Sequence, residues 1–256
     1  MRDDRNRSVD LFDEITRVAG PFGLNLTASL PVERYELTAS PAYRARAISA
    51  GCRSIVAIGN GGGDFWRAFK AHVAKNPGWL RRDNPLDDFT REVVEKEIAT
   101  RVRAAGVGCT VVYPFSDGGA TLNFMQLAML AGLAGPSIIG VVVHPRFGPW
   151  IAFRAALLLD YELDRPGTAI GFDPCPTCST RSCIGACPAA AVSFDSGWNI
   201  LACLAHRVEA HPDCSERCHA RVACVLGPDK RYPDEELAYH QARAFSVMRP
   251  HYKKLN

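Results

Sequence analysis

Eight of the ten cysteines in this 256-residue sequence lie between Cys175 and Cys224. The first four have the spacing C-x2-C-x4-C-x3-C, and the last of them, Cys187, is followed by Pro188. This spacing approximates the run C-x2-C-x2-C-x3-C-P, in which three thiolates hold one iron–sulfur cluster and the fourth binds another. Two [4Fe–4S] clusters require eight thiolates. The eight candidate metal ligands are Cys175, Cys178, Cys183, Cys187, Cys203, Cys214, Cys218 and Cys224.

Other uses of these cysteines have to be compared with iron. Zinc also binds C-x2-C pairs, but the even count of eight and the Cys187-Pro188 ending favour iron–sulfur clusters. Disulfides would require an oxidising compartment, and nothing in the sequence indicates one. The spacing from Cys214 to Cys224 is less regular than that of the first group. A single cluster or a zinc site therefore stays open beside the two-cluster interpretation.

The composition is that of an ordinary globular protein. Hydrophobic residues make up 47% and charged residues 22% of the chain. The formal charge of +3 is too small to indicate binding to nucleic acid or to a membrane surface. The polar start, Met1–Arg5, has no apolar signal core, and no apolar run is long enough to cross a bilayer. We therefore expect a cytoplasmic protein whose clustered thiols serve as ligands.

Apolar periodicity and helix-capping residues predict the elements that position the cysteine segment. Helices are predicted over 8–19, 64–74, 84–105 and 121–133, and strands over 24–31, 53–59 and 108–114. Two apolar runs, 138–144 and 150–159, predict a hairpin with an aromatic-rich connection. The cysteine segment has little periodicity, as expected where metal binding supplies folding energy. The tail after Pro233 is predicted to be helical.

A glycine run, Asn60–Gly63, precedes one of the predicted helices. Its amides could bind a phosphate at the start of that helix. The run lacks both G-x-G-x-x-G and the lysine of a P-loop, so a tight turn between a strand and a helix is the favoured interpretation. The isolated Cys52 and Cys109 are expected to be small buried side chains.

The segment Gly140–Trp150, G-V-V-V-H-P-R-F-G-P-W, resembles the H-P-R-F-G-x-W signature of the cblC-type cobalamin-processing family. Proteins of that family remove cyano and alkyl ligands from cobalamin. Further segments resemble the same family, namely Pro21–Leu24, Asp64–Lys70, Asn84–Asp87 and Arg231–Glu236.

A second resemblance, to epoxyqueuosine reductase and the reductive dehalogenases, includes the cysteines. Ala131–Gly135, then His144-Pro145, then two cysteine groups with Cys203 between them follow one another in the same order. Those proteins join a cobalamin domain to two [4Fe–4S] clusters. The resemblance implies one ligand set of Cys175, Cys178, Cys183 and Cys224, and another of Cys187, Cys203, Cys214 and Cys218.

Both resemblances imply an α+β fold of the flavin-reductase or nitroreductase type. A mixed sheet flanked by helices would be joined to a ferredoxin-like iron–sulfur segment. The predicted organisation is a cobalamin-binding domain over 1–170, the iron–sulfur segment over 171–227, and a helical tail over 228–256 that packs on the first domain.

The cblC-type signature also implies a corrinoid pocket. His144 and Arg146 would supply polar contacts, Phe147 and Trp150 would form walls, and Gly148 would allow close approach. The alternative is an ordinary hairpin with a buried histidine.

Two further residues receive roles from the resemblances. Arg231 matches a position that binds glutathione in the cblC-type family, and it would contact the corrinoid or a substrate carboxylate. Asp117 lies one residue out of register with the proton-donating aspartate of epoxyqueuosine reductase, and a solvated aspartate in a turn is the favoured alternative.

The sequence therefore predicts a cobalamin-binding iron–sulfur protein that reduces bound corrinoid, either to remove its upper ligand or to act on a substrate. One alternative is an epoxyqueuosine-type reductase of a modified nucleoside in tRNA. Another is an electron carrier or cobalamin chaperone without enzymatic activity. A corrinoid is the expected partner, and a protein electron donor and a second copy of the chain stay open.

Overall fold

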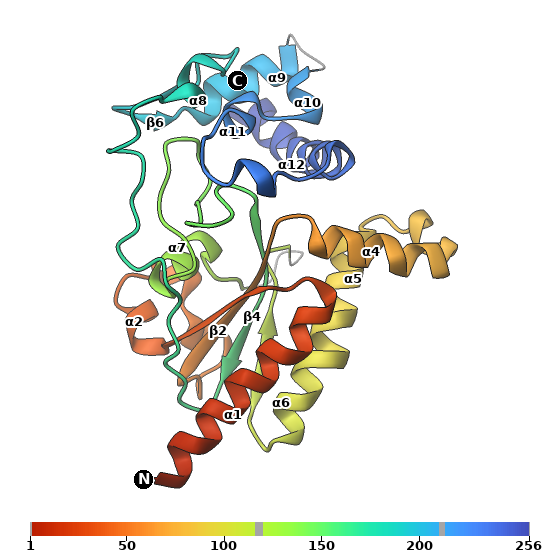
Figure 1. Ribbon diagram of the computed structural model, residues 1–256, viewed down its shortest axis with the longest axis vertical. Coiled ribbons are helices and arrows are strands. Elements are labelled where there is room, and N and C mark those ends of the chain that lie inside the picture. Colours follow the sequence, from red (N-terminus) through yellow and green to blue (C-terminus); the bar gives the residue numbers. More distant parts are fainter. Residues whose placement is uncertain (1, 116–119, 210–212, 256) are drawn as a thin grey trace. The chain divides into compact units, whose positions relative to one another are not determined.

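The computed structural model describes residues 2–115, 120–209 and 213–255, and the chain forms two compact units (Figure 1). The first unit comprises Met1–Ala134 and Ile151–Gly171, and the second comprises Gly135–Trp150 and Phe172–Asn256. The segment Gly135–Trp150, here called the 135–150 loop, thus belongs with the cysteine segment and not with the predicted 1–170 domain.

A four-stranded sheet forms the centre of the first unit. Its order is β1-β2-β4-β3, and the strands span Leu26–Pro31 (β1), Ser54–Gly61 (β2), Ile151–Leu159 (β4) and Cys109–Val112 (β3). Every pair of neighbouring described strands is antiparallel, so the prediction of a mixed sheet is wrong. All eight residues of β2 are buried, which explains why this strand appears in the sequence as a continuous apolar run.

Helices flank this sheet. The long ones are α1 (Arg2–Ala19), α4 (Asp64–Lys75) and a continuous helical run formed by α5 (Pro85–Val93), the π-helix η4 (Val94–Ala99) and α6 (Thr100–Ala104). Helix α1 packs against η4 and α6 (Figure 1). Short helices complete the unit, namely η1 (Gly20–Phe22), α2 (Val32–Glu36), η2 (Pro41–Tyr43), α3 (Ala45–Ile48), η3 (Pro77–Arg81) and α7 (Phe124–Leu130). The predicted helices and strands up to residue 133 are confirmed in type, with shifted ends.

The glycine run at the end of β2 is a tight turn, as the sequence favours. The amide of Gly61 donates to Asn25 Oδ1 at 2.7 Å, and its carbonyl accepts from Asn25 Nδ2 at 3.0 Å. Gly62 has a φ of +70°, a conformation that glycine adopts without steric cost. Because Asn25 engages both peptide groups of Gly61, this part of the turn is occupied by a structural contact.

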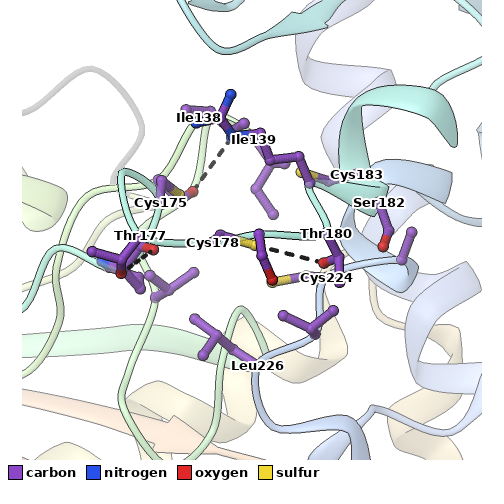
Figure 2. Close-up of a pocket in the computed structure, with 17 residues that line it drawn as sticks. Ile138, Ile139, Cys175, Thr177, Cys178, Thr180, Ser182, Cys183, Cys224 and Leu226 are labelled. Atoms are coloured by element: carbon purple, nitrogen blue, oxygen red, sulfur yellow. Dashed lines mark hydrogen bonds between the residues drawn. The ribbon is translucent and has the colours of Figure 1, made fainter.

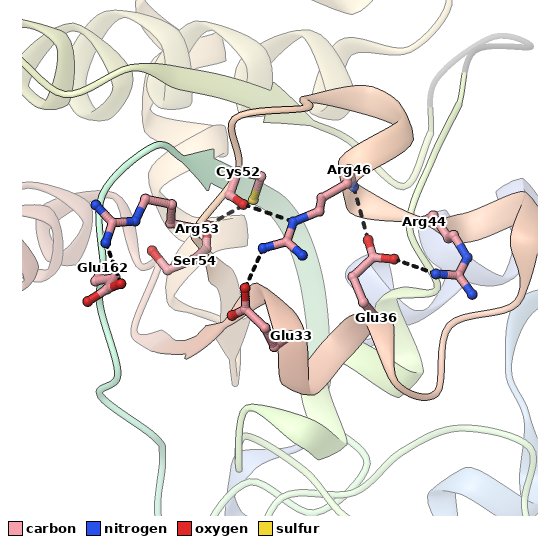
Figure 3. Close-up of polar contacts among 8 residues, drawn as sticks. All are labelled: Glu33, Glu36, Arg44, Arg46, Cys52, Arg53, Ser54 and Glu162. Carbon is pink, nitrogen blue, oxygen red and sulfur yellow. Dashed lines mark hydrogen bonds and ion pairs between the residues drawn. The ribbon is translucent and has the colours of Figure 1, made fainter.

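Exposed ion pairs hold the segment between β1 and β2 (Figure 3). Glu36 accepts from Arg44 Nη1 at 3.1 Å and from the amide of Arg46 at 3.0 Å. The guanidinium of Arg46 also pairs with Glu33 and donates to the carbonyl of Cys52 at 3.4 Å. Exposed pairs of this kind contribute at most about 1 kcal/mol each, so they orient the connection more than they stabilise the unit.

The second unit consists of short elements. These are α8 (Ser182–Gly185), β5 (Val192–Ser193), β6 (Gly197–Trp198), α9 (Ile200–Glu209), α10 (Asp213–Glu216), α11 (His219–Val222), η5 (Pro228–Lys230) and α12 (Asp234–Leu255). Helices α9 and α10 pack against α12, and α8 packs against α11. None of the helices in the described part of the chain combines the length and apolar character needed to cross a membrane.

The predicted hairpin over 138–159 is wrong in its first half. Residues 150–159 contain β4, but the 135–150 loop has only two isolated bridges, Gly135–Val143 and His144–Gly148. Most apolar side chains of this loop are buried, and Ile139 packs with Val192 and Ala220 in the second unit. A short apolar run shows that a segment is buried but does not show which element buries it.

Candidate functional site

Short helices and turns of the second unit carry the eight clustered cysteines. Cys183 lies in α8 and Cys187 two residues beyond its end, and Cys178 closes a turn by donating its amide to the carbonyl of Cys175 at 3.2 Å. Cys203 lies in α9 and Cys214 in α10. The last two cysteines flank α11, which begins after Cys218 and ends before Cys224.

The structure gathers these thiols into two sets of four. Burial raises the pKa of Cys183, and the nearby thiols of Cys224, Cys175 and Cys178 raise it further. Burial likewise raises the pKa of Cys214, followed by the thiols of Cys203, Cys218 and Cys187. These are the two sets implied by the resemblance to epoxyqueuosine reductase. We call Cys175, Cys178, Cys183 and Cys224 the first quartet, and Cys187, Cys203, Cys214 and Cys218 the second quartet.

Each quartet consists of four thiols, which is the donor set of an iron–sulfur cluster. Thiolates crowded together repel one another unless a cation neutralises them. Among the described residues, no three Cys, His, Asp or Glu side chains lie close enough to share one metal ion. In a four-iron cluster each thiolate would bind a different iron. Occupancy by iron stays a prediction.

A cavity of about 330 Å³ lies among the four thiols of the first quartet (Figure 2). The 135–150 loop contributes Ile138, Ile139 and Val143 to its wall. Hydrogen bonds from the amides of Arg181 and Thr180 and from the Thr180 side chain lower the pKa of Cys178. The first quartet thus has apolar side chains of this loop on one wall of its cavity, and the Thr180 hydroxyl lies 3.7 Å from Cys178 Sγ.

The second quartet has a different set of neighbours. The amide of Ala191 donates to Cys187 Sγ at 3.4 Å. Burial raises the pKa of Cys203, and a hydrogen bond from the Trp198 side chain opposes that effect. Burial lowers the pKa of Arg207, while the Cys203 thiol and others of the second quartet raise it. Arg207 as a residue is 7% exposed, and its guanidinium donates to the carbonyl of Gln241 at 2.9 Å, so a buried cation accompanies these thiols.

An apolar cluster separates the two quartets. Its buried members are Ile139, Val192 and Ala220. Cys183 and Cys224 of the first quartet and Cys187 and Cys218 of the second pack against it. We call these three residues the apolar partition. Ile139, one of its three residues, comes from the 135–150 loop.

His144 begins a compact turn in that loop. Its Nδ1 accepts hydrogen bonds from the amides of Arg146, at 2.9 Å, and Phe147, at 3.3 Å. The proton of the neutral imidazole is therefore on Nε2. Burial and the nearby Arg146 charge lower the pKa of His144. The ring lies 5.0 Å from that of Phe147, and the Arg146 guanidinium lies 5.2 Å from the same phenyl ring. Three predicted corrinoid contacts are thus brought together.

Trp150 occupies a different environment from the rest of the turn. It is fully buried and packs with Tyr232 and Leu237, with the two aromatic rings 5.7 Å apart and edge to face. The Arg221 guanidinium lies 5.0 Å from the Trp150 ring and donates to the carbonyl of Pro149 at 2.6 and 3.1 Å. This side chain belongs to the core of the second unit, and its predicted role as a wall of a corrinoid pocket is not visible in the structure.

The remaining predicted residues are separate from that turn. Arg231 is exposed, and its charge opposes the burial that raises the pKa of Cys224, so it lies near the first quartet. Asp117 lies outside the described residues.

Sequence reasoning missed Trp198 and Arg207. For Arg207 a signal existed, because it follows Cys203 by four residues on a helix and therefore shares its face.

Comparison with known proteins supports the fold. No protein-family model matches the sequence, and no curated protein matches it. A B12-trafficking CblC protein from C. elegans superposes with a TM-score of 0.57 at 15% identity, covering 94% of this chain and 97% of that protein. Epoxyqueuosine reductase with a tRNA stem loop gives 0.56 at 14% identity, covering 90% and 69%. A reductive dehalogenase described for B12-dependent dehalogenation gives 0.54 at 16%, covering 91% and 35%.

These similarities confirm the predicted likeness in fold to the three groups of proteins. The chain is an α+β protein with an antiparallel sheet flanked by helices, and it spans about a third of the dehalogenase. Identities this low show a shared fold, and the chemistry has to be argued from the residues of this chain.

Proposed function

We propose that this chain is a cobalamin-binding iron–sulfur protein that reduces a bound corrinoid, either to remove its upper ligand or to use it in reducing a substrate. The observation that carries the proposal is that one compact unit contains both thiol quartets and the His144–Trp150 turn. Electron donors and a corrinoid site in one unit would make transfer between them independent of a second protein.

Each quartet would hold one [4Fe–4S] cluster. When bound, such clusters supply single electrons at potentials set by charge, hydrogen bonds to sulfur and solvent exposure. Here the apolar partition limits exposure, main-chain and side-chain donors contact the thiols, and Arg207 supplies a buried positive charge. All three factors are contributed by residues of this chain.

The His144 turn would bind the corrinoid. Amide groups at the edge of a corrin ring need hydrogen-bond partners, and its hydrocarbon edge needs apolar contact. His144 presents an N–H donor at Nε2, Arg146 a guanidinium and Phe147 a buried ring. The resemblance gives Gly148 a close approach to the ligand, and in the structure the space where its Cβ would lie is 2.1 Å from the Leu226 carbonyl oxygen. Arg231, exposed near the first quartet, would bind a carboxylate or an amide of the ligand. A proton-donating role for Asp117 also belongs to this proposal.

Two other functions use the same sites. An epoxyqueuosine-type reductase would act on a modified nucleoside, and a cobalamin chaperone or electron carrier would pass on its cargo without chemistry. The fold is shared with both an epoxyqueuosine reductase and a B12-trafficking protein. The three functions differ in what happens to cobalamin after it binds.

Anaerobic reconstitution tests the proposal. Purified protein should take up about eight iron and eight sulfide per chain, as two four-iron clusters require. Added cob(II)alamin should show the spectrum of cobalamin without its lower base. With a low-potential reductant, cyano- or methylcobalamin should lose its upper ligand in stoichiometric or catalytic amounts. Binding without ligand loss would favour a chaperone, and turnover of an epoxyqueuosine-containing stem loop would favour the reductase.

A pair of cysteine variants supplies the control. Cys183→Ser removes a ligand of the first quartet and should abolish ligand removal with loss of iron. Cys109→Ser changes a half-buried thiol on β3, outside both quartets, and should change neither. Protein that stays colourless after reconstitution and binds no corrinoid would overturn the proposal, as would binding of a flavin in place of cobalamin.

A further inference from the structure

Arg221 connects the cysteine segment to the His144–Trp150 turn. Its Nε and Nη2 both donate to the carbonyl of Pro149, at 3.1 and 2.6 Å. The guanidinium also lies 5.0 Å from the Trp150 ring and 5.1 Å from the Tyr232 ring, inside the roughly 6 Å of a cation–π contact. Pro149 is buried, and a buried carbonyl needs a donor. A single charged side chain thus satisfies the backbone of this turn.

Pro149 directly follows the residues that would contact the corrinoid. The amide of His144 donates to the carbonyl of Gly148 at 2.9 Å, and the amide of Gly148 donates to the carbonyl of His144 at 2.8 Å. The ring of Pro149 fixes its own φ, so little backbone freedom separates this closed bridge from the carbonyl that Arg221 holds. The position of the Arg221 guanidinium therefore restricts the position of the turn.

The helix that carries Arg221 depends on the two quartets. Helix α11 has four residues, and isolated helices shorter than about 12–15 residues are marginal in water. Cys218 of the second quartet immediately precedes this helix, and Cys224 of the first quartet follows two residues after its end. Ala220 packs in the apolar partition. Clusters bound by both quartets would fix both ends of α11, and with them the base of the Arg221 side chain.

The chain beyond Cys224 touches the same turn. A Cβ at Gly227 would lie 2.5 Å from the carbonyl carbon of Phe147, so the two backbones are in direct contact. Arg221 precedes Cys224 by three residues and Gly227 follows it by three. The turn is thus contacted from both sides of one candidate ligand. The contact at Gly227 is made by backbone, whereas the contact at Arg221 can be removed without changing any cysteine.

We propose that Arg221 is a positioning residue through which cluster assembly orders the corrinoid turn, so that the chain binds corrinoid tightly only once its clusters are in place. The inference rests on the proposed function, because it requires loaded quartets and a corrinoid at the His144 turn. Without clusters the ends of α11 are not fixed, and the carbonyl of Pro149 loses a well-placed donor. The turn then has freedom that the corrinoid must remove on binding, which lowers affinity.

Titration of two forms of the wild-type protein with cob(II)alamin tests the coupling. One form is reconstituted anaerobically, and the other is stripped of iron with a chelator. The reconstituted form should bind roughly ten- to a hundredfold more tightly, the range expected for hydrogen bonds from a charged donor. Equal affinity of the two forms overturns the inference and leaves the proposed function intact. Iron-loaded protein that binds no cob(II)alamin contradicts the proposed function itself, and the inference with it.

Substitution of Arg221 separates this coupling from a general loss of structure in the stripped protein. Arg221→Met keeps an unbranched stem, removes every donor and changes no cysteine, so anaerobic iron loading should stay complete. The loaded variant should nevertheless bind cob(II)alamin as weakly as the stripped wild type. Arg221→Lys keeps the charge and can still donate to the carbonyl, so its affinity should lie between the two. Arg217→Met is the matched control, because Arg217 is exposed and pairs with Asp234 at 3.8 Å, and it should bind like the wild type.

Iron content decides how these variants are interpreted. A fully loaded Arg221→Met protein with wild-type affinity for cob(II)alamin overturns the inference. If Arg221→Met takes up less iron than the wild type, Arg221→Lys decides in its place. A fully loaded lysine variant with wild-type affinity then overturns the inference, and weaker binding at full iron loading supports it.

Discussion

The amide nitrogen of Gly148 lies 2.8 Å from the place that a Cβ of Gly227 would occupy. Both residues have positive φ, +56° and +55°. A Cβ at Gly148 would in turn lie 2.1 Å from the carbonyl oxygen of Leu226. Two backbones therefore cross where only glycine fits, and one of them leaves the first quartet three residues earlier, at Cys224. The crossing couples the His144 turn to the cysteine segment.

Gly148→Ala should consequently weaken both parts of the second unit. The added methyl group meets backbone and the φ is unfavourable, so we expect a loss of roughly 1–3 kcal/mol in the free energy of unfolding. Chemical unfolding of reconstituted protein measures this loss, and cob(II)alamin titration should show weaker binding. Gly51→Ala is the control, because a Cβ there meets no atom within 4 Å. If Gly148→Ala and Gly51→Ala were equally stable, the two crossing backbones could move apart without a cost in the free energy of unfolding, and this prediction would be wrong.

His144 should titrate at a pH below its usual range. Protonation of Nδ1 would break the two hydrogen bonds from the amides of Arg146 and Phe147, and burial followed by the Arg146 charge lowers the pKa further. The unfolded chain thus binds a proton more readily than the folded one. The stabilisation is complete above the unfolded pKa of about 6.5 and decreases as the pH falls from there through the folded pKa.

Imidazole nitrogen shifts in an NMR titration would check both the tautomer and the pKa. The His144 signal, assigned by its absence in His144→Gln, should show the Nε2–H tautomer at neutral pH. It should remain neutral at a pH where an exposed imidazole is half protonated. An Nδ1–H tautomer, or a midpoint above 6.5, would contradict this geometry.

Truncation of Trp150 should affect iron as well as cobalamin. Its ring fills the core with Tyr232 and Leu237, and Arg221 joins it to α11, the helix between Cys218 and Cys224. Trp150→Ala should cost about 3–5 kcal/mol, the usual range for a buried tryptophan. We expect lower iron content after reconstitution, because α11 positions a ligand of each quartet. Trp150→Phe should lose much less, and full iron loading of the alanine variant would argue that α11 is held independently.

The features of this protein that could be predicted from its sequence are those that depend on residues close together in the chain. The buried central strand Ser54–Gly61 has an unbroken apolar run from Ile55 to Ile58, and the candidate ligand cysteines recur at short intervals. The strand prediction over residues 138–144 is wrong for a physical reason. Ile139 is buried in a cluster beside thiols, and an apolar side chain there looks the same in the sequence as one buried in a sheet. Trp198 was missed because its partner Gly140 meets it only in three dimensions.

Ile139 offers the most direct test of the apolar partition. It is 7% exposed and packs beside thiols of both quartets, so a polar group there would admit water to both predicted clusters. Ile139→Thr should therefore speed the bleaching of cluster absorbance in air several-fold, without preventing anaerobic loading. Ile139→Val removes one methylene and leaves the site dry, at a cost of about 0.5–1.5 kcal/mol, so it should bleach close to the wild-type rate. If Ile139→Thr and Ile139→Val bleach at the same rate, Ile139 contributes packing and does not exclude water, and the water-excluding role of the apolar partition is wrong.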